Sequence, residues 1–231
     1  MTTRTGRQLN LLNARTDIVR DISARTHNKE ANRALAKQFG EAYFDGTRDQ
    51  GYGGYVYDGR WIPVAERIVE LFGLGPGDHV LDVGCAKGFL VNDLLQLVPG
   101  LHVYGLDISE YALARVPEAC AGRVVRGTCQ SLPFPAGAFD AVLAINTIHN
   151  LDAAGCRDAL SEIERVSGGN AFVQVDAYRN DNELQTFQDW MLTCECCLKP
   201  QEWLDLFEVA GYTGYYFWTI LRSDGRIDRE G

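Results

Sequence analysis

The stretch that decides the fold is HVLDVGCAKGF, residues 79–89. It opens with a short apolar run typical of a buried strand and continues as D-x-G-x-x-x-G while the chain turns into a helix. Gly84 permits a sharp turn and Gly88 permits close packing, and the first turn of the helix presents free N–H groups. This pattern alone is a weak indication of a nucleotide site, because glycine-rich turns serve many nucleotides.

The segments that follow repeat the alternation of strand and helix. The helices are expected at about 87–98, 109–116, 153–166, 182–193 and 200–210, and the further strands at 102–108, 123–127, 139–146, 171–178 and 213–221. Strands that are nearly continuous in apolar residues, with helices between them, indicate a parallel sheet covered on both faces. The right-handed crossover rule makes this a doubly wound α/β fold.

The N-terminal part reads as an extension of this domain. Residues 8–44 carry apolar side chains at loosely helical spacings, which suggests two amphipathic helices. The segment PVAERIVELF, residues 63–72, begins with proline at a first-turn position and ends before the stop signal GLGPGD. We therefore expect a helical extension and lid at 1–62 and one ligand-binding domain at 63–231.

Composition and charge narrow the class of protein. The chain has 231 residues, of which 46% are hydrophobic, and its formal net charge of -9 argues against a nucleic-acid partner. No apolar run reaches the length of a signal peptide or a membrane span, so we expect a cytoplasmic protein with no membrane partner. Seven cysteines read as reduced thiols. The cluster at 194–197 lacks a second ligand pair at zinc-finger spacing, so no metal is expected.

The end of the second strand strengthens the nucleotide interpretation. Asp107 stands 23 residues after Gly84 (107 − 84), where a carboxylate can accept hydrogen bonds from both hydroxyls of a ribose. Two linked features of this kind make a stronger signal than the glycine turn alone.

Four stretches together resemble the class I S-adenosylmethionine-dependent methyltransferases: VLDVGCAKGFL, GLDIS, GTCQSLPFPAGAFDAVLAINTIHNL and AGYTGYYFW. The pattern L-P-F-x-x-x-x-F-D in the third stretch is the most specific part. The resemblance covers roughly residues 63–221 and implies a Rossmann-like domain that uses S-adenosylmethionine, as methyl donor or as the substrate itself.

The resemblance also implies a row of residues along the cofactor. The methionine end would be lined by Asp82, Gly84, Cys85 and Gly88, the ribose held by Asp107, and the adenine bordered by Ile108, Cys129 and Gln130. The sequence departs from the family pattern in three places. Ala86 stands where a glycine is usual, Thr128 stands where an acidic residue often meets the adenine amine, and one C-terminal strand replaces the usual hairpin. We therefore expect a sheet of six or seven strands.

Candidate catalytic groups follow the fourth and fifth strands of the domain, where ligands of a doubly wound sheet bind. They are Asn146 and His149 in INTIHN, and Asp176 and Tyr178 in VDAYRN. His149 is the natural base candidate, with a structural histidine as the alternative. Asp176 and Tyr178 are expected on one face of the strand, where they can hold an amine. The alternative is a surface aspartate beside a packing tyrosine.

The segment GYGGYVYDGRW, residues 51–61, is the expected lid. Tyr52, Tyr55 and Tyr57 offer aromatic faces that attract a sulfonium cation and exclude water, and the glycines let the segment close. Arg60 can pair with a carboxylate of the cofactor or of an acidic substrate. The alternative is a glycine-rich turn whose aromatic residues only pack the extension onto the domain.

These features predict an enzyme that methylates a nitrogen or oxygen of a small polar metabolite. One alternative is an enzyme like azetidine-2-carboxylate synthase, in which the amino group of S-adenosylmethionine attacks its own γ-carbon and methylthioadenosine is released. A second alternative is a non-catalytic protein that binds S-adenosylmethionine. The sequence does not indicate the oligomeric state.

Overall fold

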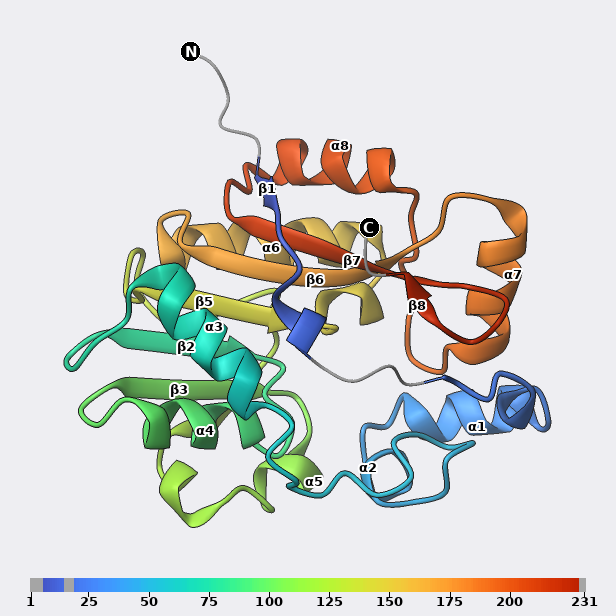
Figure 1. Cartoon of the computed structure of the whole chain (residues 1–231), viewed down its shortest axis with the longest axis horizontal. Helices are drawn as coiled ribbons and strands as arrows, with labels where there is room; N and C mark the ends of the chain where they lie inside the picture. The colour runs from blue at the N-terminus through green and yellow to red at the C-terminus, as the bar shows by residue number, and fades with distance from the viewer. Residues whose placement is uncertain (1–5, 15–18, 229–231) are drawn as a thin grey trace.

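One eight-stranded sheet forms the centre of the molecule in the computed structural model, which describes residues 6–14 and 19–228 (Figure 1). The strands are β1 (Arg7–Gln8), β2 (His79–Val83), β3 (His102–Asp107), β4 (Val124–Arg126), β5 (Ala141–Ile145), β6 (Ala171–Ala177), β7 (Tyr215–Leu221) and β8 (Ile227–Asp228). They lie in the order β1-β7-β6-β5-β2-β3-β4, with β8 also paired to β7. Every pair is parallel except β7 and β8, so the predicted doubly wound parallel sheet is confirmed.

The strand count exceeds the predicted six or seven because β1 and β8 have only two residues each. Two residues are too few to show a period in a sequence. Both pair with β7: β1 beside Tyr215 and Tyr216, and β8 beside Ile220 and Leu221. The long strand β7 runs parallel to β6, and the two-residue β8 returns antiparallel along the end of β7. A short hairpin is therefore present where the sequence predicts a single strand.

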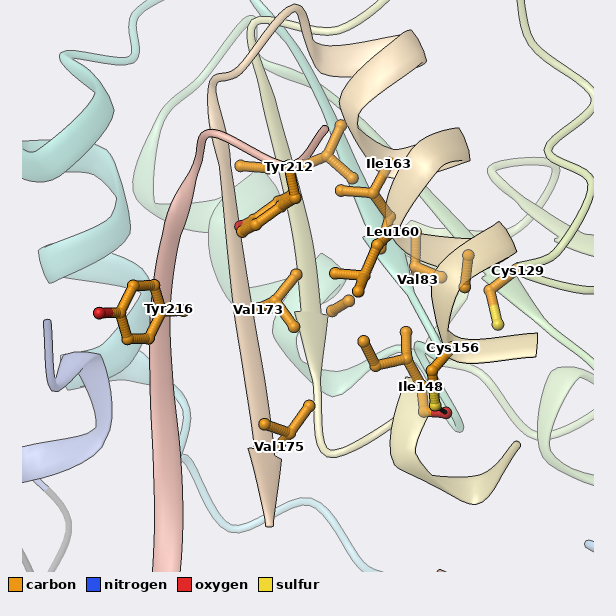
Figure 2. Packing of buried hydrophobic residues seen from close by; sticks show 14 of the residues in the cluster. Val83, Cys129, Ile148, Cys156, Leu160, Ile163, Val173, Val175, Tyr212 and Tyr216 are labelled. Carbon is orange, nitrogen blue, oxygen red and sulfur yellow. Dashed lines mark hydrogen bonds between the residues drawn. The ribbon is translucent and has the colours of Figure 1, made fainter. Parts of the chain in front are cut away.

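Alternate residues of each strand enter two hydrophobic clusters, one on each face of the sheet. On β5, Val142 and Ala144 belong to one cluster, and Ala141 and Leu143 belong to the other. Figure 2 shows the first cluster, packed beneath α6 (Ala153–Ser167). Helix α8 (Pro200–Ala210) covers the same face, while α3 (Ile62–Phe72) and α4 (Phe89–Leu97) cover the other.

The helices of the domain begin and end close to the predicted residues. Helix α6 begins where the Asp152 carboxylate accepts the Gly155 N–H at 2.8 Å, and it ends at Gly168, whose φ of 61° favours glycine. Helix α5 (Glu110–Leu113) is shorter than expected, and α7 (Asp181–Trp190) ends earlier because Met191 is extended. Among the described residues, no helix combines the length and apolarity needed to cross a membrane.

The N-terminal extension is less regular than the two predicted helices. It contains the 3-10 turns η1 (Leu11–Ala14) and η2 (Ser23–Arg25) and the short helices α1 (Lys29–Ala36) and α2 (Glu41–Phe44). Turn η2 and helices α1 and α2 lie beyond the carboxyl ends of the central strands, with η2 in contact with α7, while η1 packs against α3 (Figure 1). Arg33 and Lys37 on this side form ion pairs with Glu195, at 2.9 and 2.6 Å. The extension is thus docked on a segment some 160 residues later in the chain.

Candidate active site

A pocket of about 340 Å³ lies at the carboxyl ends of β2, β5, β6 and β7. Its sheet side is lined by Asp82, Gly84, Asn146, Gln174, Asp176 and Thr219. Its cover comes mainly from two remote segments, residues 20–61 of the extension and residues 187–194 around the end of α7. This is the edge at which ligands bind in doubly wound sheets.

The turn after β2 forms one end of the pocket. Gly84 has a φ of 81°, and a Cβ built on it would lie 2.1 Å from Oγ1 of Thr147, so only glycine fits there. Ala86 also has a positive φ, 51°, which is unfavourable for a residue with a side chain. Its N–H donates to the Asp107 carboxylate at 2.7 Å, which helps to hold this conformation.

Asp82 is a buried carboxylate that lines the pocket. Burial, and then the nearby charge of Asp107, raise the pKa of Asp82 to about 7. Within the described part of the chain, no side-chain hydrogen bond involves Asp82. A buried carboxylate that has no side-chain hydrogen bond is stabilised when a cation binds next to it.

Asp107 lies outside the pocket lining and is tied to the backbone. One carboxylate oxygen accepts the Ala86 N–H, and the other accepts the Ser109 N–H at 2.8 Å. Each oxygen keeps a second lone pair, so the predicted bonds to a ribose need no rearrangement of these contacts. Burial raises the pKa of Asp107 despite its backbone hydrogen bonds.

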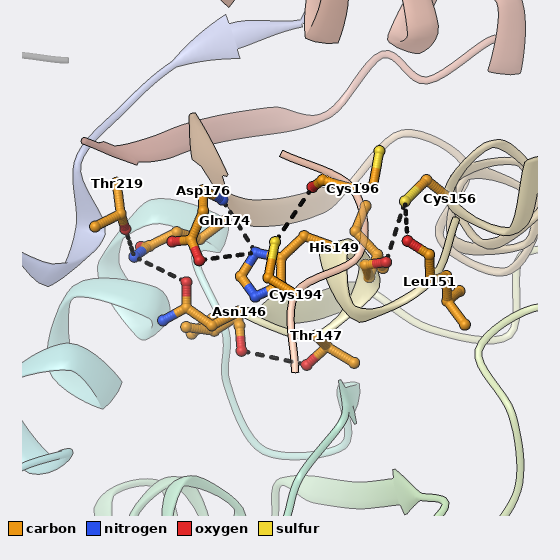
Figure 3. A network of polar contacts seen from close by, with 12 residues as sticks. Asn146, Thr147, His149, Leu151, Cys156, Gln174, Asp176, Cys194, Cys196 and Thr219 are labelled. Carbon is orange, nitrogen blue, oxygen red and sulfur yellow. Dashed lines mark hydrogen bonds and ion pairs between the residues drawn. The ribbon is translucent and has the colours of Figure 1, made fainter. Parts of the chain in front are cut away.

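The ends of β5 and β6 bring three predicted catalytic residues into the pocket. Asn146, His149 and Asp176 all line it, and Figure 3 shows them in one polar network. The Asp176 backbone N–H donates to Nδ1 of His149 at 3.0 Å, and Oδ2 of Asp176 lies 3.6 Å from the same nitrogen. Gln174 joins the network by donating to Oγ1 of Thr219 at 3.0 Å.

Comparisons with known proteins agree with this architecture. A family model described as a methyltransferase domain matches residues 80–168. The chain is 36% identical over 129 residues to sterol 24-C-methyltransferase ERG6B of Gibberella zeae, covering 50% of this chain and 33% of that protein. It is 34% identical over 128 residues to demethylmenaquinone methyltransferase of Symbiobacterium thermophilum, covering 52% and 50%.

The matched domain and these identities agree with the resemblance to the class I S-adenosylmethionine-dependent methyltransferases. The chain spans half or less of the length of these two relatives. The solved structure of the cyclase SpnF is similar in fold, with a TM-score of 0.52 and 19% identity, over 85% of this chain and 74% of that one. S-adenosylmethionine is the cofactor of the family, and a buried, unsatisfied Asp82 beside the Gly84 turn fits its cationic methionine end.

Most of the other residues expected to contact the cofactor lie around the pocket rather than in it. Cys85 lines the pocket beside Gly84, and burial raises the pKa of its thiol. Gly88 caps the N-terminus of α4 and lies outside the lining. The adenine side of the predicted site also lies beyond the pocket: Ile108 is 55% exposed, Gln130 is exposed, and Cys129 is buried with its pKa raised to about 11. Their roles toward the adenine remain predictions.

The hydrogen bond to Nδ1 of His149 determines which ring nitrogen carries the proton. Because Nδ1 accepts a backbone N–H, the neutral ring carries its own proton on Nε2. In this state the imidazole can donate a hydrogen bond to a ligand but has no free lone pair to act as a base. Burial raises the pKa of Asp176, against the opposing effect of His149, which suits a carboxylate that accepts a proton.

Tyr178 does not join Asp176, contrary to the expectation from strand alternation. Strand β6 ends at Ala177, so the alternation of faces stops before Tyr178. The Tyr178 N–H donates to the Leu198 carbonyl, and its ring faces Lys199 with the ammonium 6.0 Å from the ring centroid. Tyr178 is absent from the lining of the pocket. In the structure Tyr178 thus lies apart from Asp176, and its catalytic role stays a prediction.

The expected lid contributes only part of its aromatic residues to the pocket. Tyr52 and Tyr55 line it, with ring centroids 4.5 Å apart, and Tyr55 also stacks on Phe89. Tyr57 lies outside the lining because its hydroxyl donates to Asp93 of α4 at 2.6 Å. Arg60 lines the pocket but pairs with Asp58 through several hydrogen bonds.

Sequence reasoning missed the second half of the cover, residues 187–194, which includes Phe187, Trp190 and Cys194. Nothing local marks these residues, because they reach the pocket only when α7 docks on the extension. Cys194 also brings its sulfur within 4.8 Å of ligand atoms of His149 and Asp176, the one group of potential metal ligands found in the described ranges. Because Nδ1 of His149 already accepts a backbone N–H and Nε2 carries the proton of the neutral ring, this arrangement offers no free imidazole nitrogen to a metal.

Proposed function

We propose that this protein transfers a methyl group from S-adenosylmethionine to a nitrogen or oxygen of a small polar metabolite. The observation that carries the proposal is the single pocket that joins the cofactor turn at Asp82 and Gly84 to Asn146, His149 and Asp176. The cofactor supplies an electrophilic methyl group on a sulfonium when it is bound. The chain then needs to align an acceptor, exclude water and take one proton.

Asp82, Asp176 and His149 each have a distinct role in this chemistry. Asp82 holds the ammonium of the methionine end, because both groups otherwise lack a partner in a buried site. Asp176 accepts the proton of the acceptor, since burial has already raised its pKa. Nε2–H of His149 donates to the acceptor and orients its lone pair, because Nδ1 is held by the backbone.

The two-part cover excludes water from the reacting atoms. Tyr52 and Tyr55 line the pocket from one part and Trp190 lines it from the other, and the faces of the two tyrosines can also stabilise a desolvated cation. Tyr43 lines the pocket as well, and burial of its hydroxyl raises the pKa of this group well above its usual value.

The test is incubation of the protein with S-adenosylmethionine, alone and with a panel of small amines and alcohols, followed by mass spectrometry. Acceptor-dependent S-adenosylhomocysteine supports methyl transfer. Methylthioadenosine formed from S-adenosylmethionine alone would instead support cyclisation to azetidine-2-carboxylate. Binding measured by calorimetry without any turnover would support a non-catalytic protein. Asp176→Asn is the inactive reference, and Arg157→Gln on the exposed face of α6 is the matched control.

A further inference from the structure

Arginines dominate the charged residues of the pocket. Its lining includes Arg20, Arg25, Arg48, Arg60 and Arg226, against two carboxylates, Asp82 and Asp176. The whole chain has the opposite balance, with 31 acidic and 22 basic residues. A concave site whose charge opposes that of the molecule concentrates ligands of the other sign, here anions.

Three of these arginines surround the ring of Trp190. The guanidinium carbons of Arg20, Arg25 and Arg48 lie 5.7, 3.8 and 5.4 Å from the ring centroid. The three side chains come from different points of the extension, while Trp190 ends α7. The cluster therefore forms at the junction between the two parts of the cover.

Arg25 holds this junction together. Its guanidinium donates to the carbonyls of Arg48 and Gly51 on one part of the cover and to the carbonyl of Trp190 on the other. These partners carry no negative charge. Burial, and then the charges of Arg48 and Arg20, lower the pKa of Arg25 to about 10. The fold thus places like charges close together beside the buried Arg25, which favours the binding of an anion there.

Arg48 and Arg226 are placed to meet that anion. Both are exposed residues that line the pocket, and they come from opposite ends of the chain. Arg48 uses Nη1 to donate to the Tyr52 carbonyl at 2.8 Å, and a guanidinium has five N–H donors in all. Arg60 contributes less, because Asp58 already neutralises it.

We propose that the methyl acceptor is a small carboxylate, bound through Arg48 and Arg226 against the ring of Trp190. This inference rests on the proposed function and names its substrate class. A planar guanidinium matches a carboxylate in two-point contact. Phe187, Leu192 and Phe217 also line the pocket, so the organic body of a singly charged ligand fits better than a doubly charged phosphate, whose desolvation costs more.

The experiment titrates benzoate, benzamide and inorganic phosphate into the protein saturated with S-adenosylhomocysteine, by calorimetry and thermal shift. Benzoate is expected to bind at least tenfold more tightly than benzamide, and more weakly as sodium chloride rises from 50 to 300 mM, by roughly severalfold. Arg48→Gln and Arg226→Gln should each weaken benzoate at least fivefold. Arg157→Gln should leave it unchanged, and all variants should bind S-adenosylhomocysteine as the wild type does.

Several results would overturn the proposal. Equal binding of benzoate and benzamide, or no effect of either arginine variant, removes the anion site. Preferential binding of phosphate makes the substrate class wrong. Binding of benzoate only when S-adenosylhomocysteine is absent assigns the arginines to the carboxylate of the cofactor. Each titration is repeated on the free protein, so a failure of S-adenosylhomocysteine to bind counts against the proposed function and leaves the anion test intact.

Discussion

Protonation of Asp82 should control how tightly the cofactor binds as the pH changes. The pKa of this buried carboxyl is raised to about 7, so it is neutral in the free protein at acidic pH. Only the ionised form attracts the ammonium of the methionine end. As the pH falls through 7, the carboxyl takes up a proton and loses this attraction, so affinity must fall with decreasing pH.

The size of the effect follows from the ionised fraction. A group of pKa about 7 is about half ionised at pH 7 and about 1% ionised at pH 5, so affinity should drop by up to about 50-fold between these values. Near pH 5 the slope should approach about one tenfold change per pH unit. A carboxyl with the ordinary pKa of about 3.9 would lose almost no affinity over the same interval.

Calorimetric titration of S-adenosylhomocysteine from pH 5 to pH 7 measures this slope. Asp82→Asn should bind more weakly at pH 7 and show little dependence on pH. Methylthioadenosine, which lacks the amino-acid group, should show little dependence with the wild type. Affinity of S-adenosylhomocysteine that stays constant down to pH 5, or an Asp82→Asn variant with the wild-type slope, would refute the role of this carboxylate.

Three further predictions concern single residues. Asp107→Ala should weaken cofactor binding at least tenfold, because two charge-assisted hydrogen bonds of about 1.5 to 3 kcal/mol each are lost; an unchanged dissociation constant would remove Asp107 from the site. Gly84→Ala should lower the free energy of unfolding by about 1 to 3 kcal/mol, because of the positive φ at this residue and a clash with Thr147. Adding Thr147→Ala should restore part of this loss. A melting temperature equal to that of the wild type would show that the turn is not constrained. Asp176→Asn should slow single-turnover methyl transfer by about a hundredfold or more with little change in cofactor affinity, and His149→Gln should slow it less; the reverse order would make the histidine the base.

The parts of the fold that the sequence predicts well depend on local signals. The apolar strand at β2 and the glycine at residue 84 lie within a few residues of each other. The strand and the turn after it can therefore be predicted from the local sequence alone. The ends of α6 were predictable because Asp152 and Gly168 are capping residues. The two-residue strands were not, because their pairing depends on where β7 ends up in space.

The residues of the site also divide into those that the local sequence predicts and those that come together only in the folded protein. Asn146, His149 and Asp176 follow strands, so the carboxyl edge of the sheet brings them together as predicted. Tyr178 was misplaced because the pattern does not show that β6 ends at Ala177. Arg25 and Trp190 meet across 165 residues of chain, and neither carries a local motif, so their contact could be seen only in the folded protein.

The two short strands on β7 also bear on how the molecule behaves in solution. Strand β7 reads YYFWTIL, a run of aromatic and β-branched residues that would readily template strand addition by another molecule. Residues 7–8 pair with its first two residues, and residues 227–228 pair with its last two. These two short strands therefore limit the pairing of β7 with other molecules. Removing either strand would expose backbone N–H and C=O groups of β7 and make aggregation more favourable.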